Sequence, residues 1–149
     1  MGGTSIRIRK ARRSDVERIA QLSGELGYPA TAAQIATRLR QLKPASKHAV
    51  FVAESRDAAA GLVGWLHVSV SHLLESDIRA EVNGLIVAEG QRSAGAGAKL
   101  LEAAEEWARR HGGQAMNVRS NVIRERAHSF YERNGYEHYK TQKAFRKAL

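Results

Sequence analysis

A glycine-bearing loop between an apolar strand and a long helix is the most constraining feature of this sequence. The apolar run Leu85–Val87 is followed by the loop Gln91–Gly97, which passes directly into a helical pattern ending near Arg110. Unpaired amide N–H groups at a helix start converge on one concavity, where the helix dipole adds partial positive charge. Arg92 adds a full charge and a forked set of donors. The loop is therefore typical of a phosphate cradle, and the alternative is a tight turn whose glycines serve only the backbone.

Two familiar nucleotide-binding loops do not fit this segment. A Walker A loop requires Lys and then Ser or Thr after its second glycine, whereas Gly95 is followed by Ala96 and Lys99 by Leu100. A dinucleotide fingerprint requires a third glycine at position 100 and an opening βαβ unit, whereas this loop follows two hairpin strands. The sequence therefore excludes a P-loop and disfavours a Rossmann fold.

Strand and helix patterns alternate along the whole chain. Alternating or β-rich runs predict strands over 6–9, 48–54, 61–71, 81–87, 114–119 and 136–145. Apolar residues at helical spacing predict helices from 14 to 24 or 27, from 31 to about 42, over 95–110 and over 123–133. Ser14 with Glu17, and Thr31 with Gln34, have the pattern of capping boxes. Because no linker or repeat interrupts the pattern, we expect one α/β (α+β) domain over residues 1–149.

Composition narrows the classes of function. The 149 residues carry 24 Lys and Arg against 15 Asp and Glu, a formal charge of +9, and contain no cysteine. A disulfide framework, thiolate zinc sites and a cysteine nucleophile are thereby excluded, and no His/Asp/Glu spacing predicts a metal site. The chain shows neither a membrane-spanning run nor a signal-peptide core, so we expect a cytoplasmic protein. The charge fits nucleic acid, anionic lipid, a phosphorylated small molecule or simply a basic soluble surface; nucleic acid is disfavoured because few aromatics accompany the basic clusters.

Two motifs together resemble a known family. Arg92–Gly97 matches the Arg/Gln-x-x-Gly-x-Gly/Ala loop of the GNAT acyl-CoA N-acyltransferases, and Ala127–Tyr136 resembles their late Ala-x-x-Phe/Leu-Tyr-x-x-x-Gly-Phe/Tyr segment. The order of predicted elements is also similar. One departure is Arg124, where many members carry Asn. The resemblance implies a mixed central sheet that splays between its fourth and fifth strands, with flanking helices, and acetyl-CoA as cosubstrate.

The resemblance also implies how the cofactor binds. In the family, the loop amides bind the pyrophosphate and the preceding strand pairs its backbone with the pantetheine arm. The corresponding residues here are Leu85, Ile86 and Val87 for the arm, and Arg92, Ser93, Ala94, Gly95, Ala96 and Gly97 for the pyrophosphate. Tyr131 occupies the position of the family's general acid, which also contacts the cofactor; the alternative is a core ring.

Amine acylation requires a neutral amine, a polarised thioester and a proton for the thiolate, with no covalent enzyme intermediate. Glu81 is the candidate base, and the alternative is a solvated carboxylate. It shares strand parity with Asn83 and Leu85 unless a bulge intervenes, which Gly84 suggests. We also consider His67, His72 and His128 as proton carriers, against the commoner structural role of a lone histidine.

The acceptor is predicted to be a primary amine on a small molecule or peptide. Tyr28 and Glu25, between the first two helices, could line its pocket. The sequence looks closest to small-molecule and aminoglycoside-type enzymes; the positive charge argues against polycations unless Glu25, Glu75, Asp77 and Glu81 form an acidic cluster. The final predicted strand could support a homodimer. The alternatives are a CoA-binding regulator without turnover and a basic nucleic-acid-binding module.

Overall fold

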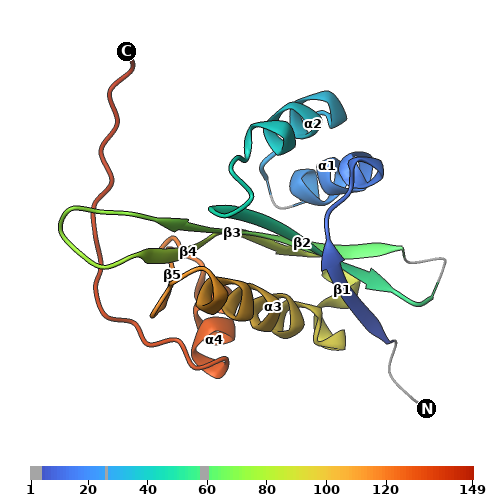
Figure 1. Cartoon of the computed structure of the whole chain (residues 1–149). Helices are drawn as coiled ribbons and strands as arrows, with labels where there is room; N and C mark the ends of the chain where they lie inside the picture. Colours follow the sequence, from blue (N-terminus) through green and yellow to red (C-terminus); the bar gives the residue numbers. More distant parts are fainter. Residues whose placement is uncertain (1–4, 26, 58–60) are drawn as a thin grey trace. The chain divides into compact units, whose positions relative to one another are not determined.

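The computed structural model describes residues 5–25, 27–57 and 61–149, which form two compact units. The first unit, Met1–Val118, contains the sheet and its covering helices, and the second, Arg119–Leu149, contains one helix (Figure 1). No helix in the described ranges combines the length and apolarity required to cross a bilayer.

The sheet of the first unit has five strands in the order β1-β2-β3-β4-β5. The first four pair antiparallel, and β5 pairs parallel to β4. The strands are β1 (Ile6–Lys10), β2 (His48–Ser55), β3 (Leu62–Ser71), β4 (Arg79–Val87) and β5 (Met116–Val118). The predicted mixed sheet is therefore confirmed, with a fifth strand shorter than the sequence pattern indicated.

Helices cover both faces of this sheet (Figure 1). α1 (Val16–Glu25) and α2 (Ala32–Gln41) lie over one face, and α3 (Ala96–Arg110) lies over the other. The apolar stripe of α3 is fully buried and includes Leu100, Leu101, Ala104 and Trp107. Two 3-10 turns, η1 (Arg13–Asp15) and η2 (Glu89–Ala94), precede α1 and α3, and α4 (Glu125–Arg133) forms the second unit's helix.

One predicted capping box is confirmed and the other is wrong. The Thr31 hydroxyl accepts from the Gln34 amide at 3.1 Å, and the Gln34 side chain accepts from the Thr31 amide at 2.9 Å. Ser14 instead lies inside η1, and Asp15 performs the capping, because its carboxylate accepts from the Arg12 amide at 2.7 Å. Asp15 takes precedence because its carboxylate also pairs with a half-buried arginine.

That arginine, Arg9, ties β1 to the start of α1. Its guanidinium contacts Asp15 through two nitrogens at 2.8 and 2.9 Å and contacts Glu54 on β2 at 3.0 Å. Burial alone would raise the pKa of Asp15, but the hydrogen bonds from Arg9 and Arg12 outweigh burial and hold it below its ordinary value of 3.8. The acidic group is therefore charged and fixed at neutral pH.

The predicted final strand over 136–145 is wrong. Residues 136–149 contain neither helix nor strand, and Tyr139 and Phe145 are 68% and 91% exposed. Tyr139 and Phe145 are six residues apart and would share one face of a strand, but Tyr136 would lie on the other face, and Thr141 and Lys143 separate the two apolar residues, so no continuous apolar face results. The segment also has no strand partner within the described residues.

Candidate active site

The neighbouring strands β4 and β5 pair over a short length and then separate. Their ladder joins Ala80 to Met116, Glu81 to Asn117 and Val82 to Val118. β4 continues to Val87, and no strand among the described residues pairs with this side of it beyond Val82. The backbone N–H and C=O groups on this side of residues 83–87 are thus left without a ladder partner, which is the arrangement that an added extended chain can use.

A bulge in β4 begins where this ladder stops. Val82 pairs with Val68 on β3 and Gly84 pairs with His67, so that Asn83 is the extra residue. The Asn83 side-chain amide donates to the Ser69 hydroxyl at 2.7 Å, and Ser69 is 7% exposed. This hydrogen bond fixes the bulged residue to the adjacent strand.

Trp65 holds the other side of the bulge. A Cβ placed on Gly84 would lie 2.9 Å from two carbons of the Trp65 indole, so only glycine fits there without displacing the ring. Trp65 in turn packs against Leu22, Ile86 and Ala88. The bulge is therefore held by a polar contact on one residue and an aromatic contact on the next.

The bulge decides which side chains share a face. Glu81 is paired with Ser69, on the face that α1 and α2 cover, whereas Leu85 is paired with Leu66 on the α3 face. The parity expected for an unbroken strand is therefore wrong beyond Asn83, and the bulge that Gly84 suggested is present. Leu85, Ile86 and Val87 are buried or half-buried, so the part of this strand open to a ligand is its backbone.

The predicted phosphate cradle has the backbone geometry of an open helix start. Gly95 adopts φ of +81°, and a Cβ there would meet no atom within 4 Å. The amide of Lys99 is bonded to the carbonyl of Gly95 at 3.1 Å, so the amides of Ala96, Gly97 and Ala98 precede the first intrahelical bond of α3. Arg92 donates to the carbonyl of Val87 at 3.4 Å, which ties the loop to the end of β4. The side chain of Ser93 lies outside the described part.

Tyr131 belongs to the second unit and lies near the end of α4. Its ring makes edge contacts with Phe130 and Tyr136, with centroids 5.3 and 5.8 Å apart. Burial raises the pKa of the Tyr131 phenol above its ordinary value of 10, and the charge of Arg124 partly opposes this shift. The phenol therefore keeps its proton throughout the physiological range, as a general acid must.

A pair of histidines lies on the same sheet face as Glu81. The Nδ1 of His48 is 3.1 Å from the Nε2 of His67, and Ser69 is paired with His48 on one side and with Glu81 on the other. Burial, followed by the charge of His48, lowers the pKa of His67 to about 4. The sequence analysis considered His67 together with His72 and His128 as proton carriers. It missed both His48 and Ser69, because their association with His67 depends on strand register.

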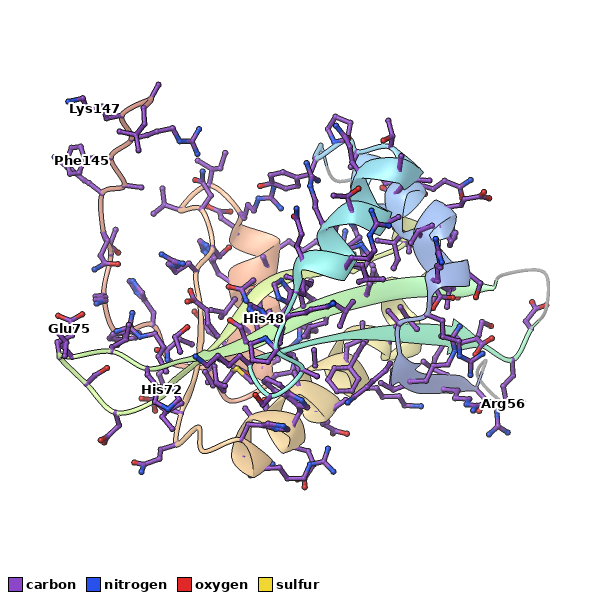
Figure 2. The ribbon with its side chains drawn as sticks, turned by 45° about the horizontal axis from the view of Figure 1, so that its top comes forward. His48, Arg56, His72, Glu75, Phe145 and Lys147 are labelled. Carbon is purple, nitrogen blue, oxygen red and sulfur yellow. The ribbon has the colours of Figure 1, made fainter. Side chains whose placement is uncertain are left out.

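The acidic residues considered for a cationic acceptor do not form one cluster. Glu75 lies at the tip of the loop between β3 and β4, which projects beyond the part of the sheet that α1 and α2 cover, whereas Glu25 is the last residue of α1 (Figures 1 and 2). Tyr28, just beyond α1, is 62% exposed, and Leu26 lies outside the described residues. His72 follows β3, and the His128 ring is 2.8 Å from the Asn121 carbonyl within the second unit.

A family model described as the acetyltransferase (GNAT) family matches residues 14–136. The chain belongs to the GNAT family. The match runs through both compact units and contains both motifs, so the resemblance inferred from the sequence is confirmed.

Curated relatives match parts of the chain. The uncharacterized N-acetyltransferase YhfO of Bacillus subtilis is 38% identical over 56 residues, which are 38% of each protein. The aminoalkylphosphonate N-acetyltransferase of Salmonella typhimurium is 36% identical over 75 residues, 49% of each. The matched segments thus span less than half of these two GNAT relatives.

Solved structures match the fold over nearly all of the chain. The aminoglycoside N-acetyltransferase AAC(6')-Iy in complex with CoA has a TM-score of 0.84 at 17% identity and covers 99% of this chain and 98% of its own. AAC(6')-Ih from Acinetobacter baumannii has a TM-score of 0.81 at 15% identity, covering 97% and 99%. At these identities the likeness shows the GNAT fold, and it confirms the predicted fold class.

Proposed function

We propose that this chain transfers an acetyl group from acetyl-CoA to a primary amine by direct attack, without a covalent enzyme intermediate. The observation that carries the proposal is the run of unladdered β4 backbone from Asn83 to Val87, which leads into the amide-rich start of α3. The family resemblance implies that the pantetheine arm pairs with such a strand edge and that the diphosphate binds at such a helix start. The family membership and the names of the relatives agree with this reading.

In this proposal the cofactor is bound mainly through the main chain. Leu85, Ile86 and Val87 pair with the amide groups of the arm, and the segment from Arg92 through Gly97 receives the pyrophosphate. The open space at Gly95 and the helix dipole of α3 favour an anion there. The net charge of +9 favours approach of a polyanionic cofactor.

The chemistry requires a base for the amine and an acid for the thiolate. Glu81 receives the proton of the ammonium acceptor, which frees the nitrogen lone pair for attack on the thioester carbonyl. The C–N bond forms as the C–S bond breaks, and the Tyr131 phenol donates its proton to the departing sulfur. The attacking nitrogen then loses its second proton to the Tyr131 phenolate, which leaves a neutral amide and restores the phenol, and Glu81 releases its proton to solvent. The raised pKa of Tyr131 supports this role because the phenol is protonated at neutral pH.

The acceptor class, location and assembly are broader proposals. We infer a small-molecule or peptide amine, since one relative is named for an aminoalkylphosphonate and structural neighbours are named for aminoglycosides. The predictions of a cytoplasmic location and a homodimer remain predictions; light scattering of the purified chain measures its assembly, and imaging of a tagged chain measures its location.

The test combines acetyl-CoA binding with a panel of primary amines. We expect acetyl-CoA to raise the melting temperature and at least one amine to release thiol, measured with a chromogenic disulfide; the chain contributes no thiol because it has no cysteine. Binding of acetyl-CoA with no turnover on a broad panel would favour the CoA-binding regulator. No binding at millimolar acetyl-CoA would reject the proposal, and steeply salt-dependent binding to oligonucleotides would then favour the nucleic-acid-binding module.

A further inference from the structure

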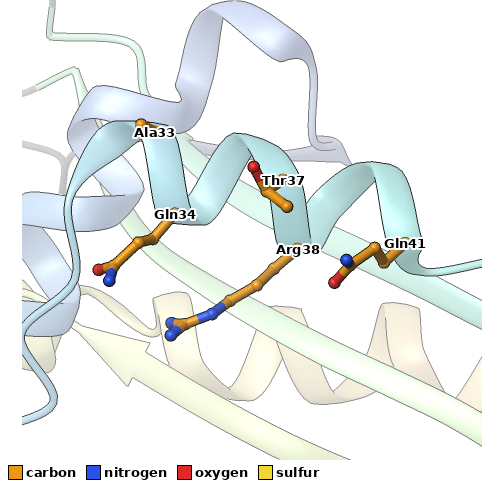
Figure 3. A pocket seen from close by; sticks show the side chains of 5 residues that line it. All are labelled: Ala33, Gln34, Thr37, Arg38 and Gln41. Atoms are coloured by element: carbon orange, nitrogen blue, oxygen red, sulfur yellow. The ribbon is translucent and has the colours of Figure 1, made fainter.

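A shallow, solvent-exposed hollow of about 320 Å³ lies along one side of α2, and all the residues that line it belong to this helix (Figure 3). The residues that line it follow a helical stripe: Ala33, Gln34, Thr37, Arg38 and Gln41. The side chains of Gln34 and Arg38 extend in the same direction from this helix. The lining offers one cation and several hydrogen-bonding groups, and it contains no carboxylate.

Three side chains that line this hollow keep hydrogen-bond donors that no described residue accepts from. Arg38 makes no hydrogen bond or ion pair with any described residue. Gln34 uses its side-chain oxygen to accept from the Thr31 amide at 2.9 Å, which leaves its NH₂ group to donate elsewhere. Thr37 accepts from Arg40 at 3.2 Å, so its own O–H hydrogen remains to be donated. The guanidinium, an amide and a hydroxyl thus all present hydrogens along one stripe.

Helix α2 does not require these polar residues for packing. None of its residues is fully buried, and it contacts the rest of the first unit mainly through α1. Its sequence, Ala32–Gln41, contains no acidic residue that would neutralise Arg38. The positive potential at this stripe is therefore uncompensated within the helix.

The hollow lies over the same sheet face as the candidate base. Both α1 and α2 cover the face that carries Glu81, opposite to α3 (Figure 1). Beyond Leu42 the chain passes into β2, whose first residue, His48, is paired with Ser69, and Ser69 is paired with Glu81. An amine acceptor that presents its nitrogen to Glu81 therefore has α2 on its side of the sheet.

From this placement we propose that α2 binds an anionic group of the amine acceptor, with Arg38 as the charged contact and Gln34 and Thr37 as additional donors. The inference rests on the proposed acetyl transfer and names the class of its acceptor: a primary amine that also carries a carboxylate, phosphate or phosphonate. A planar guanidinium donates two parallel hydrogen bonds to such groups. A second ammonium group would meet Arg38 with no carboxylate to offset the repulsion, so polyamines are disfavoured.

The test uses amines that share a two-carbon chain and differ in their second group. Ethanolamine carries a neutral hydroxyl, β-alanine a carboxylate, phosphoethanolamine a phosphate, and ethylenediamine a second amine. We expect kcat/KM for β-alanine or phosphoethanolamine to exceed that for ethanolamine by about 10- to 100-fold, as hydrogen bonds to charged groups allow. Whichever of these two amines has the higher kcat/KM shows whether the site prefers a carboxylate or a phosphate.

Arg38→Gln then isolates the contact. We expect it to raise KM for the preferred anionic amine to near the level of ethanolamine, while kcat, KM for ethanolamine and the dissociation constant of acetyl-CoA stay unchanged. Arg110→Gln removes the same charge at the end of α3, on the other sheet face, and should change none of these values. Equal melting temperatures of the two variants and the parent exclude a folding defect.

Two outcomes overturn the inference while leaving the proposed function standing. One is turnover of ethanolamine or ethylenediamine at least as efficient as that of both anionic amines. The other is an equal loss for all amines, or for none, in Arg38→Gln. The proposed function fails separately, when calorimetry shows no binding of acetyl-CoA to the parent chain, and that result overturns the inference with it.

Discussion

The Asn83 side-chain amide donates to the Ser69 hydroxyl at 2.7 Å, at the residue where β4 parts from β5. The bulge and the end of the parallel ladder therefore coincide at one position. Because Ser69 is also paired with Glu81 in the strand register, one buried residue of β3 binds the bulge through its side chain and lies opposite the candidate base through its backbone.

Removing this hydrogen bond should affect KM for acetyl-CoA more than it affects the stability of the fold. We expect Asn83→Ala to cost about 1 kcal/mol of unfolding free energy and to raise KM for acetyl-CoA about tenfold, since the strand edge is displaced. Urea unfolding and steady-state kinetics measure the two effects. Ser71→Ala, at the exposed end of the same β3 strand, is the matched control and should leave both unchanged. An unchanged KM in Asn83→Ala would contradict the positioning role.

Gly95 should be intolerant of a side chain although space surrounds it. Its φ of +81° lies in the left-handed region, so Gly95→Ala introduces about 1–2 kcal/mol of backbone strain at the mouth of the cradle. We expect a lower melting temperature and about tenfold weaker acetyl-CoA binding by calorimetry. Gly90→Ala, also in open space but without a positive φ, is the control. Equal effects at the two glycines would show that the backbone conformation at Gly95 is not what binds the anion.

Tyr131→Phe tests the proposed acid directly. We expect kcat to fall by about 100-fold or more while the dissociation constant of acetyl-CoA is unchanged. Tyr139→Phe, at an exposed ring in the same unit, should have no effect. Because burial raises the pKa of Tyr131, the alkaline loss of kcat should lie above the pH expected for a free phenol, and Arg124→Gln should move it higher still. Unchanged kcat in Tyr131→Phe removes this residue from the chemistry.

The histidine pair should make stability depend on pH in the acid range. Unfolded His67 takes up a proton at its ordinary pKa of 6.5, whereas the folded residue does so only near 4. The unfolded state therefore binds more protons in this interval, and stability falls as the pH drops through it. We expect a loss of roughly 1–2 kcal/mol, given the partial solvent screening at this site.

Urea unfolding at pH 7 and pH 4.5 measures the dependence on His67. The His67→Asn variant should lose less stability than the parent between these two pH values. A parent chain equally stable at both would contradict a folded His67 that resists protonation.

Local sequence signals predicted the parts of the site that depend on local structure. The strand at Leu85, the glycine loop and the α3 stripe are encoded within about two dozen consecutive residues, and they lie where the pattern placed them. The Thr31 cap was predicted for the same reason. Gly84 also indicated the bulge, because an isolated glycine in a strand is typical of one.

Features that depend on residues distant in the sequence escaped prediction. The contacts of Ser69 with Asn83 and of His48 with His67 require the register of three strands, which no local pattern specifies. Asp15 displaced Ser14 as the cap because Arg9, which also donates to Glu54, binds the Asp15 carboxylate from outside the helix. The strand expected over 136–145 had suitable residues but lacked the alternation that would bury one face.

The burial of Leu85, Ile86 and Val87 has an evolutionary consequence. Peptide groups are chemically alike at every position, so the proposed binding of acetyl-CoA through the main chain tolerates the exchange of one apolar residue for another at these positions. Under this proposal, substitutions in α1 and α2 can change which amine is bound while the binding of acetyl-CoA stays the same. A fold that uses different residues for acetyl-CoA and for the amine is suited to acquire new amine acceptors while keeping acetyl-CoA as the acetyl donor.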